Sequence, residues 1–358
     1  MKLVIFGLSV SSSWGNGHAT LWRGLIRALA RLGHRVIFYE RDVPYYAEHR
    51  DVPALADGDL KLYSRWEDVA ACASADLSDA DVGIVTSYCH DGIAAAELIL
   101  SAKAPLSVFY DLDTPVTIER VKNGDPVPYL GPNGLEDFDL VLSYTGGTAL
   151  TELEDRLGAR RVLPLYGSVD PAVHYPLPPV ERYRADLSYL GTYAEDRQRA
   201  LGELLLEPAR RLPARTFLIG GAQYPPEFPW SENIYFAQHV APAEHAAFYC
   251  SSRLTLNVTR APMVARGYCP SGRLFEAAAC GIPVVTDSWN GLTDFFEPGS
   301  EILVAFSTDD AMDALETSDQ ELARIARAAR ERTLAEHTAD RRASQLVAAI
   351  EGAFAVEA

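Results

Sequence analysis

Short apolar runs without polar alternation are the feature of this sequence that most restricts its fold. Leu3 to Leu8 is such a run, and a Ser/Gly-rich loop follows it. Leucines then recur at helical spacing from Leu21 to Leu32, and Gly33 stands where a helix would end. An unalternating run is typical of a strand buried on both faces of a parallel sheet. The pattern therefore predicts a strand–loop–helix unit at the start of the chain.

The same alternation of strand and helix continues through the first half of the sequence. Further strands are expected at 36–39, 82–86, 106–110 and 140–144, and a further helix at 93–100. Right-handed crossovers between parallel strands place the strand-to-helix loops along one edge of the sheet. The first half therefore reads as a doubly wound, Rossmann-like α/β domain.

A proline-rich stretch from Pro164 to Pro179 has no helical period and suits a connector. Beyond it the alternation restarts, with strands expected at 187–190, 217–219, 254–258 and 282–286, helices at 197–212 and 272–280, and a helical tail at 319–358 broken near His337. The expected fold class is α/β, with two Rossmann-like doubly wound domains facing a central cleft. The expected ranges are an N-terminal domain 1–175, a C-terminal domain 176–335, and a helix 336–358 that packs back towards the N-terminal domain.

Composition limits the partners of the chain. Its 358 residues carry a formal net charge of -17, which argues against general affinity for nucleic acid or anionic membranes. The five cysteines form no C-x-x-C pair or His/Cys metal pattern and read as reduced, mostly buried thiols. We see no signal peptide and no apolar stretch of membrane length, so a cytoplasmic location is expected.

The richest segment for chemistry is SGRLFEAAACGIPVVTD, from Ser271 to Asp287. A helix that begins at Gly272 would present free N–H groups and the positive end of its dipole to an anion, and Arg273 adds donors suited to a diphosphate. Glu276, one turn further on, could accept both hydroxyls of a ribose. The alternative is an ordinary surface pair between Arg273 and Glu276, which would carry no function.

This segment resembles the donor-binding region of glycosyltransferases of the GT-B fold. In those enzymes a glutamate of an E-A-x-x-x-G-x-P-V-V stretch holds the nucleotide ribose, and EAAACGIPVV from Glu276 to Val285 matches that stretch. The resemblance extends to the CgeB-like spore-maturation group of family 1 or 4 type, through LNVTRAPMVARGYCPSGRLFEAAACGIPVVTDSWNGL, VFYDLDTPVTIERV and DLSYLGTYAEDRQ.

The resemblance implies a set of roles. Glu276 would bind the ribose, while Asn257, Arg260 and Arg273 would line the diphosphate end of a UDP-, dTDP- or GDP-linked sugar. No metal ion and no further cofactor would be required. One position departs from the family pattern: many retaining members carry a second glutamate eight residues before the ribose one, and Tyr268 stands there. The stereochemical outcome is therefore open.

Other loops of the second half offer weaker candidates for the donor site. Gly191 and Thr192 follow a predicted strand, where a glycine lets the backbone approach a phosphate. Asn290 and Gly291 follow another strand and could meet the sugar or a phosphate. A tight turn explains either pair about equally well.

The first half offers candidates for the acceptor side. Gly17 and His18 lie just before the first helix, where some inverting GT-B enzymes carry a general base, and the pKa of histidine suits that task. Asp111 and Asp113 end a strand, and Asp113 could deprotonate or orient an acceptor hydroxyl. Helix capping and turn formation are the alternatives.

These observations together predict a glycosyltransferase that moves a sugar from a nucleoside-diphosphate donor to an acceptor. The donor would bind the C-terminal domain and the acceptor the N-terminal domain. Two alternatives stay open: a nucleotide-sugar epimerase of the same fold, and a non-catalytic nucleotide-sugar-binding protein. The sugar, the base, the acceptor and the oligomeric state do not follow from the sequence.

Overall fold

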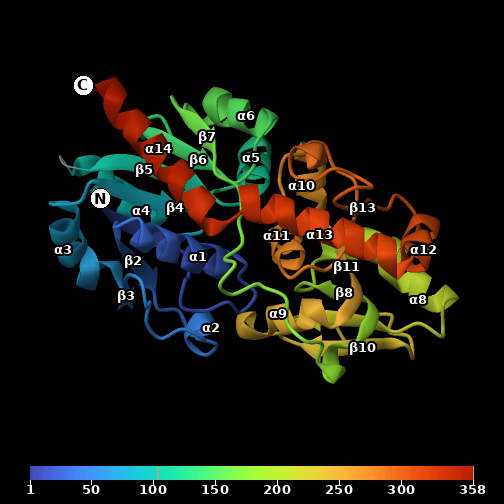
Figure 1. Ribbon diagram of the computed structural model, residues 1–358. Helices are drawn as coiled ribbons and strands as arrows, with labels where there is room; N and C mark the ends of the chain where they lie inside the picture. The colour runs from blue at the N-terminus through green and yellow to red at the C-terminus, as the bar shows by residue number, and fades with distance from the viewer. Residues whose placement is uncertain (103–104, 358) are drawn as a thin grey trace. The chain divides into compact units, whose positions relative to one another are not determined.

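The computed structural model describes residues 1–102 and 105–357 and divides into two compact units (Figure 1). Unit 1 consists of Met1–Gly167 and Ala339–Ala358, and unit 2 of Ser168–Thr338. Ala358, the last residue of the expected helical tail, lies outside the described residues. Each unit is a parallel sheet with helices, which confirms the prediction of two Rossmann-like doubly wound domains.

Unit 1 is built on a seven-stranded parallel sheet in the order β3-β2-β1-β4-β5-β6-β7. Its strands are β1 (Lys2–Gly7), β2 (Arg35–Arg41), β3 (Asp59–Tyr63), β4 (Val82–Thr86), β5 (Leu106–Asp111), β6 (Leu140–Ser143) and β7 (Val162–Pro164). The chain first adds strands on one side of β1 and then adds β4 on the other side. The topological switch point therefore lies between β1 and β4, where ligands of open α/β sheets bind.

Helices cover both faces of this sheet. They are α1 (His18–Arg31), α2 (Pro44–Ala47), α3 (Trp66–Leu77), α4 (Gly92–Ser101), α5 (Thr114–Asn123), α6 (Thr148–Leu157) and α14 (Ala339–Glu357). Along β1, Leu3 and Ile5 pack in the core that α1 and α14 share, and Val4 and Phe6 pack in the core under α3, α4 and α6. Figure 1 shows α14, in red, beside α1. Burial on both faces explains why β1 has no polar alternation.

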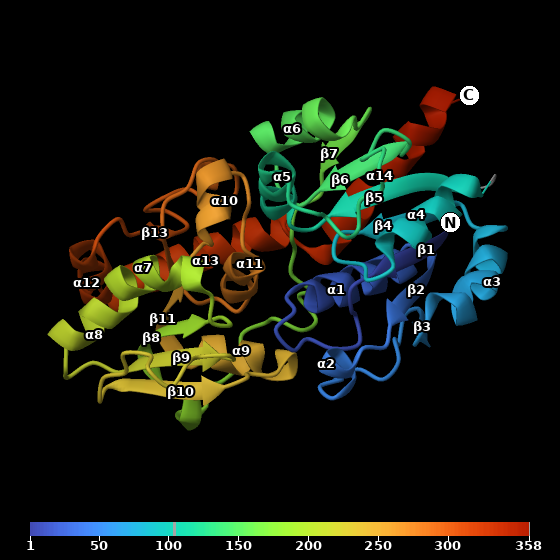
Figure 2. The same ribbon diagram turned by 180° about the vertical axis from the view of Figure 1, so that it is seen from behind.

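Unit 2 repeats this arrangement with a six-stranded parallel sheet in the order β10-β9-β8-β11-β12-β13 (Figure 2). Its strands are β8 (Ala185–Leu190), β9 (Phe217–Gly221), β10 (Ile234–Gln238), β11 (Ser252–Asn257), β12 (Val284–Thr286) and β13 (Leu303–Val304). The switch point lies between β8 and β11 by the same reasoning. The loops that follow these two strands are therefore the place to look for a ligand site.

The helices of unit 2 differ from the predicted pattern in two ways: those at 242–250, 261–266 and 308–316 were not expected, and the helix expected at 197–212 is divided. Its longer helices are α9 (Pro242–Cys250), α10 (Ala261–Arg266), α11 (Gly272–Ala279), α12 (Thr308–Glu316) and α13 (Asp319–Glu336), with short 3₁₀ turns η1 (Glu181–Tyr183), η2 (Glu195–Arg197) and η4 (Leu292–Asp294). The helix expected at 197–212 is instead divided into α7 (Gln198–Leu201), a π-helical segment η3 (Gly202–Leu206) and α8 (Glu207–Arg211). Pro208 has no N–H to donate to the carbonyl of Leu204, which breaks the regular α pattern here.

Two expectations drawn from composition can be compared with the structure. All five cysteines are free, and all except Cys72 are buried, which confirms the reading of mostly buried thiols. Within residues 1–102 and 105–357, no helix is long and apolar enough to cross a membrane.

Asp111, the last residue of β5, is a fully buried carboxyl group with a perturbed pKa. Its side chain is 0% exposed; Oδ1 accepts the backbone N–H of Asp113 at 3.0 Å, and Oδ2 is buried without a hydrogen-bond partner. Burial raises the pKa of Asp111 to about 6, against the opposing effect of the Asp113 N–H. The folded state therefore binds a proton at this site more tightly than the unfolded chain does.

This shift predicts the effect of Asp111→Asn on stability. Between the unfolded pKa of 3.8 and the folded value of about 6, the native state holds the extra proton, so the wild type loses stability as pH rises. Asparagine keeps an acceptor for the Asp113 N–H and does not ionise. The unfolding free energy of the variant minus that of the wild type should therefore increase between pH 4 and pH 7, by up to about 3 kcal/mol.

Urea unfolding at a series of pH values measures this difference. Asp125→Asn, which removes the same charge from an exposed position, is the matched control and should leave the pH dependence unchanged. Parallel pH profiles for the wild type and Asp111→Asn would contradict the prediction.

Candidate functional site

The N-terminus of α11 lies at the carboxyl edge of the sheet in unit 2, because α11 is the crossover between β11 and β12. Ser271 caps the helix, and its side chain accepts the N–H of Arg273. A Cβ placed on Gly272 would meet no atom within 4 Å, so the space beside the first turn is open. The free N–H groups of this turn and the helix dipole favour an anion here.

Three arginines gather near this helix end. Arg197, which follows β8, feels the positive charges of both Arg273 and Arg260. Burial and then Arg273 lower the pKa of Arg197 to about 10. The like charges repel one another, Asp196 offsets part of that repulsion through its ion pair with Arg260, and a further anion would offset more of it.

Each of the three guanidinium groups makes a hydrogen bond, and Arg197 also has a donor without an acceptor among the described residues. Arg197 donates from Nη1 to the Thr192 carbonyl at 3.2 Å, while its Nε is buried without a partner. Arg260 donates from Nε to Asp196 at 2.9 Å, and Arg273 donates from Nη1 to the Ser271 hydroxyl at 3.3 Å. The buried Nε of Arg197 is a charged donor for which the described residues supply no acceptor.

Arg197 is a residue that the sequence analysis did not select. It lies six residues after Gly191, in the loop and turn that follow β8, and the same reasoning about strand ends could have identified it. Helical spacing places Arg197 at the start of the helix expected at 197–212. In the structure it ends η2 instead.

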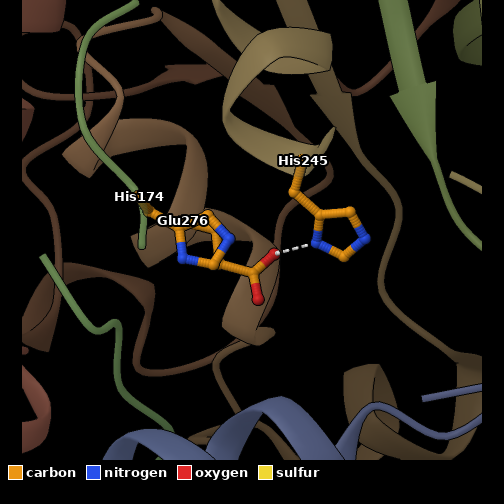
Figure 3. Close-up of side chains that lie close together, drawn as sticks. All are labelled: His174, His245 and Glu276. Atoms are coloured by element: carbon orange, nitrogen blue, oxygen red, sulfur yellow. Dashed lines mark ion pairs between the residues drawn. The ribbon is translucent and has the colours of Figure 1, made fainter. Parts of the chain in front are cut away.

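Glu276 lies on α11 with its carboxylate among polar groups (Figure 3). Tyr249 donates its hydroxyl to Oε2 at 3.2 Å, and His245 Nδ1 lies 3.9 Å from the same oxygen. Burial pushes the pKa of Glu276 upward, but electrostatic interactions with His174, His245 and Arg273 together hold it below its usual value. The side chain is therefore an ionised acceptor, and its hydrogen-bond and short-range partners are Tyr249 and His245 rather than Arg273.

The other donor candidates that follow β8 and β11 have clear structural roles. A Cβ on Gly191 would fall 2.6 Å from the hydroxyl of Tyr189, so close packing alone requires glycine there. The carbonyl of Thr192 accepts from Arg197. Asn257 is 1% exposed and donates to the Thr286 hydroxyl at 3.0 Å, while its Oδ1 is buried without a partner.

Asn290 and Gly291 form a turn against Tyr268. Gly291 has φ +86°, and a Cβ there would come within 2.5 Å of the Tyr268 ring. The Tyr268 N–H donates to the Asn290 carbonyl at 2.7 Å. This conformation and close approach explain the Asn-Gly sequence without any ligand.

In unit 1, the loop after β1 is held by a buried glutamate. Glu40, on β2, accepts four hydrogen bonds: from the Ser9 hydroxyl at 2.8 Å, the Val10 N–H at 2.7 Å, and the Ser11 N–H and hydroxyl at 2.9 and 2.6 Å. A dinucleotide fold would use an acidic residue near this place to bind a ribose. Both oxygens of Glu40 instead fix the loop that leads to Gly17.

The structure brings His18, Asp111 and Asp113 to one region of unit 1. The Tyr88 hydroxyl donates to Asp113 Oδ2 at 2.8 Å, and the Tyr88 ring lies 6.1 Å from the His18 ring. Nδ1 of His18 is buried without a partner. Burial lowers the pKa of His18, against the opposing effect of Asp113, so the imidazole is neutral at neutral pH.

Gly17, Asp113 and Asp111 have different structural surroundings. Gly17 is the N-cap residue of α1 and has open space where a Cβ would lie. Asp113 precedes α5 but makes no side-chain cap with it, so helix capping does not account for this carboxylate. Asp111 is buried and supports Asp113 through its N–H.

Comparison with known proteins bears on the fold and on the C-terminal part of the chain. Residues 197–348 match the family model described as glycosyl transferase-like. Comparison with curated protein sequences gives no match.

Solved structures match over nearly the whole chain. Sucrose-phosphate synthase from Thermosynechococcus elongatus is 14% identical, with a TM-score of 0.70 over 99% of this chain and 100% of that one. The Anabaena protein HepE in complex with UDP and glucose is also 14% identical, with a TM-score of 0.69 over 98% and 100%. An α-glucosyltransferase in complex with UDP and a 13-mer DNA is 13% identical, with a TM-score of 0.71 over 98% and 99%.

Structural similarity at 13–14% identity shows the fold alone. The family model gives a separate sequence similarity over residues 197–348. The chain therefore has the GT-B fold, and residues 197–348 are similar to the glycosyl transferase-like family.

Proposed function

We propose that this protein is a glycosyltransferase that moves a sugar from a nucleoside-diphosphate donor, with UDP as the nucleotide, to an acceptor. The observation that carries the proposal is the cluster of Arg197, Arg260 and Arg273 near the N-terminus of α11. Three of the matching structures, including HepE and the α-glucosyltransferase, were determined with UDP or UDP-glucose, which supports the choice of nucleotide.

The arginine cluster supplies what the departing diphosphate needs. Negative charge develops on the diphosphate as the bond to the sugar breaks, and donors fixed in a partly buried site stabilise that charge. Arg197 is pre-positioned by the Thr192 carbonyl, and Arg260 by Asp196. We therefore propose that transfer requires no metal ion at the diphosphate.

Glu276 would bind the ribose. Its carboxylate is ionised and buried among polar side chains, one turn along the helix from Arg273. A ribose presents two adjacent hydroxyl donors, which match the two oxygens of one carboxylate. The motif around Glu276 also supports placement in the CgeB-like group.

His18 would act as the general base towards the acceptor, with Asp113 as its electrostatic partner. A neutral imidazole can accept a proton from an acceptor hydroxyl, and Asp113 stabilises the imidazolium that forms. Tyr88 holds Asp113 by a hydrogen bond.

Free thiols also fit the proposed cytoplasmic location, because that compartment keeps cysteines reduced.

Substitutions in unit 2 should separate the two ends of the nucleotide. Arg197→Ala removes a charge-assisted hydrogen bond to the diphosphate, so UDP affinity should fall by about 10- to 100-fold while the affinity for uridine stays the same. Glu276→Ala should lower the affinity for both UDP and uridine, because both ligands carry the ribose. Isothermal titration calorimetry measures the affinity of the wild type and of each variant for UDP and for uridine.

Arg199→Ala is the matched control, because Arg199 lies two residues away with a side chain that is 91% exposed. It removes the same charge and should leave UDP binding unchanged. An equal loss in Arg199→Ala and Arg197→Ala would indicate general electrostatics rather than a site. Absence of UDP binding to the wild type would refute the donor assignment.

The pH dependence of turnover should report His18. With UDP-glucose as donor and water as acceptor, release of UDP should decline as pH falls through the lowered pKa of His18, so the acidic limb lies below 6.5. His18→Gln should reduce the rate by about 10²- to 10⁴-fold and abolish that limb, while UDP affinity is retained.

His34→Gln is the control for this experiment, since His34 also has a lowered pKa but contacts the N-terminal amine. Its profile should match the wild type. An acidic limb that persists in His18→Gln would assign the base elsewhere. A wild type that binds UDP-glucose but never releases UDP would favour the non-catalytic binding protein.

A further inference from the structure

Two histidines and one glutamate meet in unit 2 from distant points of the sequence. His174 lies in the segment before η1, His245 on α9 and Glu276 on α11. One ligand atom of each lies within 4.8 Å of the other two, and Figure 3 shows the two imidazole rings beside the carboxylate. Sequence spacing gave no sign of this group, because 71 and 31 residues separate its members.

The ring nitrogens that face this group lack partners. His174 is only 4% exposed, yet neither Nδ1 nor Nε2 has a hydrogen-bond partner among residues 1–102 and 105–357. Nδ1 of His245 is also buried and unpartnered. Burial of a polar nitrogen without a partner is unfavourable, and native structures rarely leave three such atoms together. Three such nitrogens beside the Glu276 carboxylate indicate that a cation belongs between them.

The surrounding contacts orient these groups as the outer shell of a metal site does. His245 Nε2 lies 3.2 Å from the Val240 carbonyl, so an Nε2–H donated there leaves Nδ1 as a lone-pair donor towards Glu276. Tyr249 donates its hydroxyl to the Glu276 carboxylate at 3.2 Å. A metal-binding histidine typically donates its other ring N–H to a carbonyl or carboxylate in this way.

We propose that His174, His245 and Glu276 bind a divalent transition-metal ion of the Zn²⁺ class. Two imidazoles and one carboxylate suit Zn²⁺ and its neighbours, whereas Mg²⁺ and Ca²⁺ prefer oxygen ligands alone. Three protein ligands leave a further position for water or another ligand. Small side-chain rotations would shorten the 3.9 Å separation of His245 and Glu276 to the spacing of atoms on one ion.

This site is distinct from the proposed stabilisation of the diphosphate, which rests on the arginines. It shares Glu276 with the proposed ribose contact, where Oε2 faces Tyr249 and His245. Metal binding can be measured without donor or acceptor. Its failure would therefore leave the proposed transferase function untouched, and failure of that function would leave the metal site untouched.

The test is titration of ZnCl₂ into the full-length, chelator-treated protein by calorimetry. The wild type should bind one ion per chain. His174→Gln and His245→Gln should each weaken binding by at least about 100-fold, since loss of an outer-shell partner alone reduces affinity by about 10- to 100-fold. Tyr249→Phe removes such an outer-shell partner, so its Zn²⁺ affinity should fall by only about 10- to 100-fold.

Two control variants locate the ligands. His49→Gln removes a histidine of unit 1 and should bind Zn²⁺ like the wild type. Cys250→Ser tests a thiol at the end of α9, the helix that carries His245, and should also bind like the wild type. Loss of binding in Cys250→Ser with full binding in His245→Gln would overturn the proposed ligand set.

Folding of the variants is checked by their melting temperatures without metal. If His174→Gln does not fold, the visible spectrum of Co²⁺ bound to the wild type still decides. Intense bands of a four- or five-coordinate ion support the site. The weak spectrum of hydrated Co²⁺, or a Zn²⁺ titration without heat of specific binding, would show that the histidines only form an ion pair with Glu276 and would overturn the proposal.

Discussion

The mutual repulsion of three arginines is the constraint on which the proposed donor site depends. Burial, and then the positive charges of Arg273 and Arg260, lower the pKa of Arg197 to about 10, and its buried Nε lacks a partner among the described residues. Folding tolerates this arrangement because the Thr192 carbonyl, Asp196 and the Ser271 hydroxyl each accept one hydrogen bond. A diphosphate would bring further negative charge to the positive end of α11.

Different contacts fix the loops that follow the strands in the two units. Unit 1 uses a buried carboxylate, Glu40, whose four hydrogen bonds fix the loop before His18. Unit 2 uses glycine at 191, packed against Tyr189, and the turn at Gly291 packed against Tyr268. Each unit has a group with an unmet hydrogen bond, His18 in one and Arg197 in the other, in the segment that follows a strand at its switch point.

Strand periodicity predicted much of the fold, because strands such as β1 and β4 are buried on both faces and keep unbroken apolar runs. It missed β3 and β10, where exposed or partly exposed residues interrupt the apolar run, the very short strands β7 and β13, and the π segment before Pro208. The motif around Glu276 located one part of the candidate site. His174 and His245 could not be predicted, since only the folded chain brings them to Glu276.

The central claim is that α11 and its arginines hold a nucleoside diphosphate, and a crystal structure of the protein with UDP tests it most directly. The account predicts that the ribose hydroxyls lie within hydrogen-bond distance of Glu276 and that the phosphates contact Arg197 and Arg273 at the first turn of α11. UDP bound elsewhere, or bound here with its ribose away from Glu276 and its phosphates away from both arginines, would contradict it.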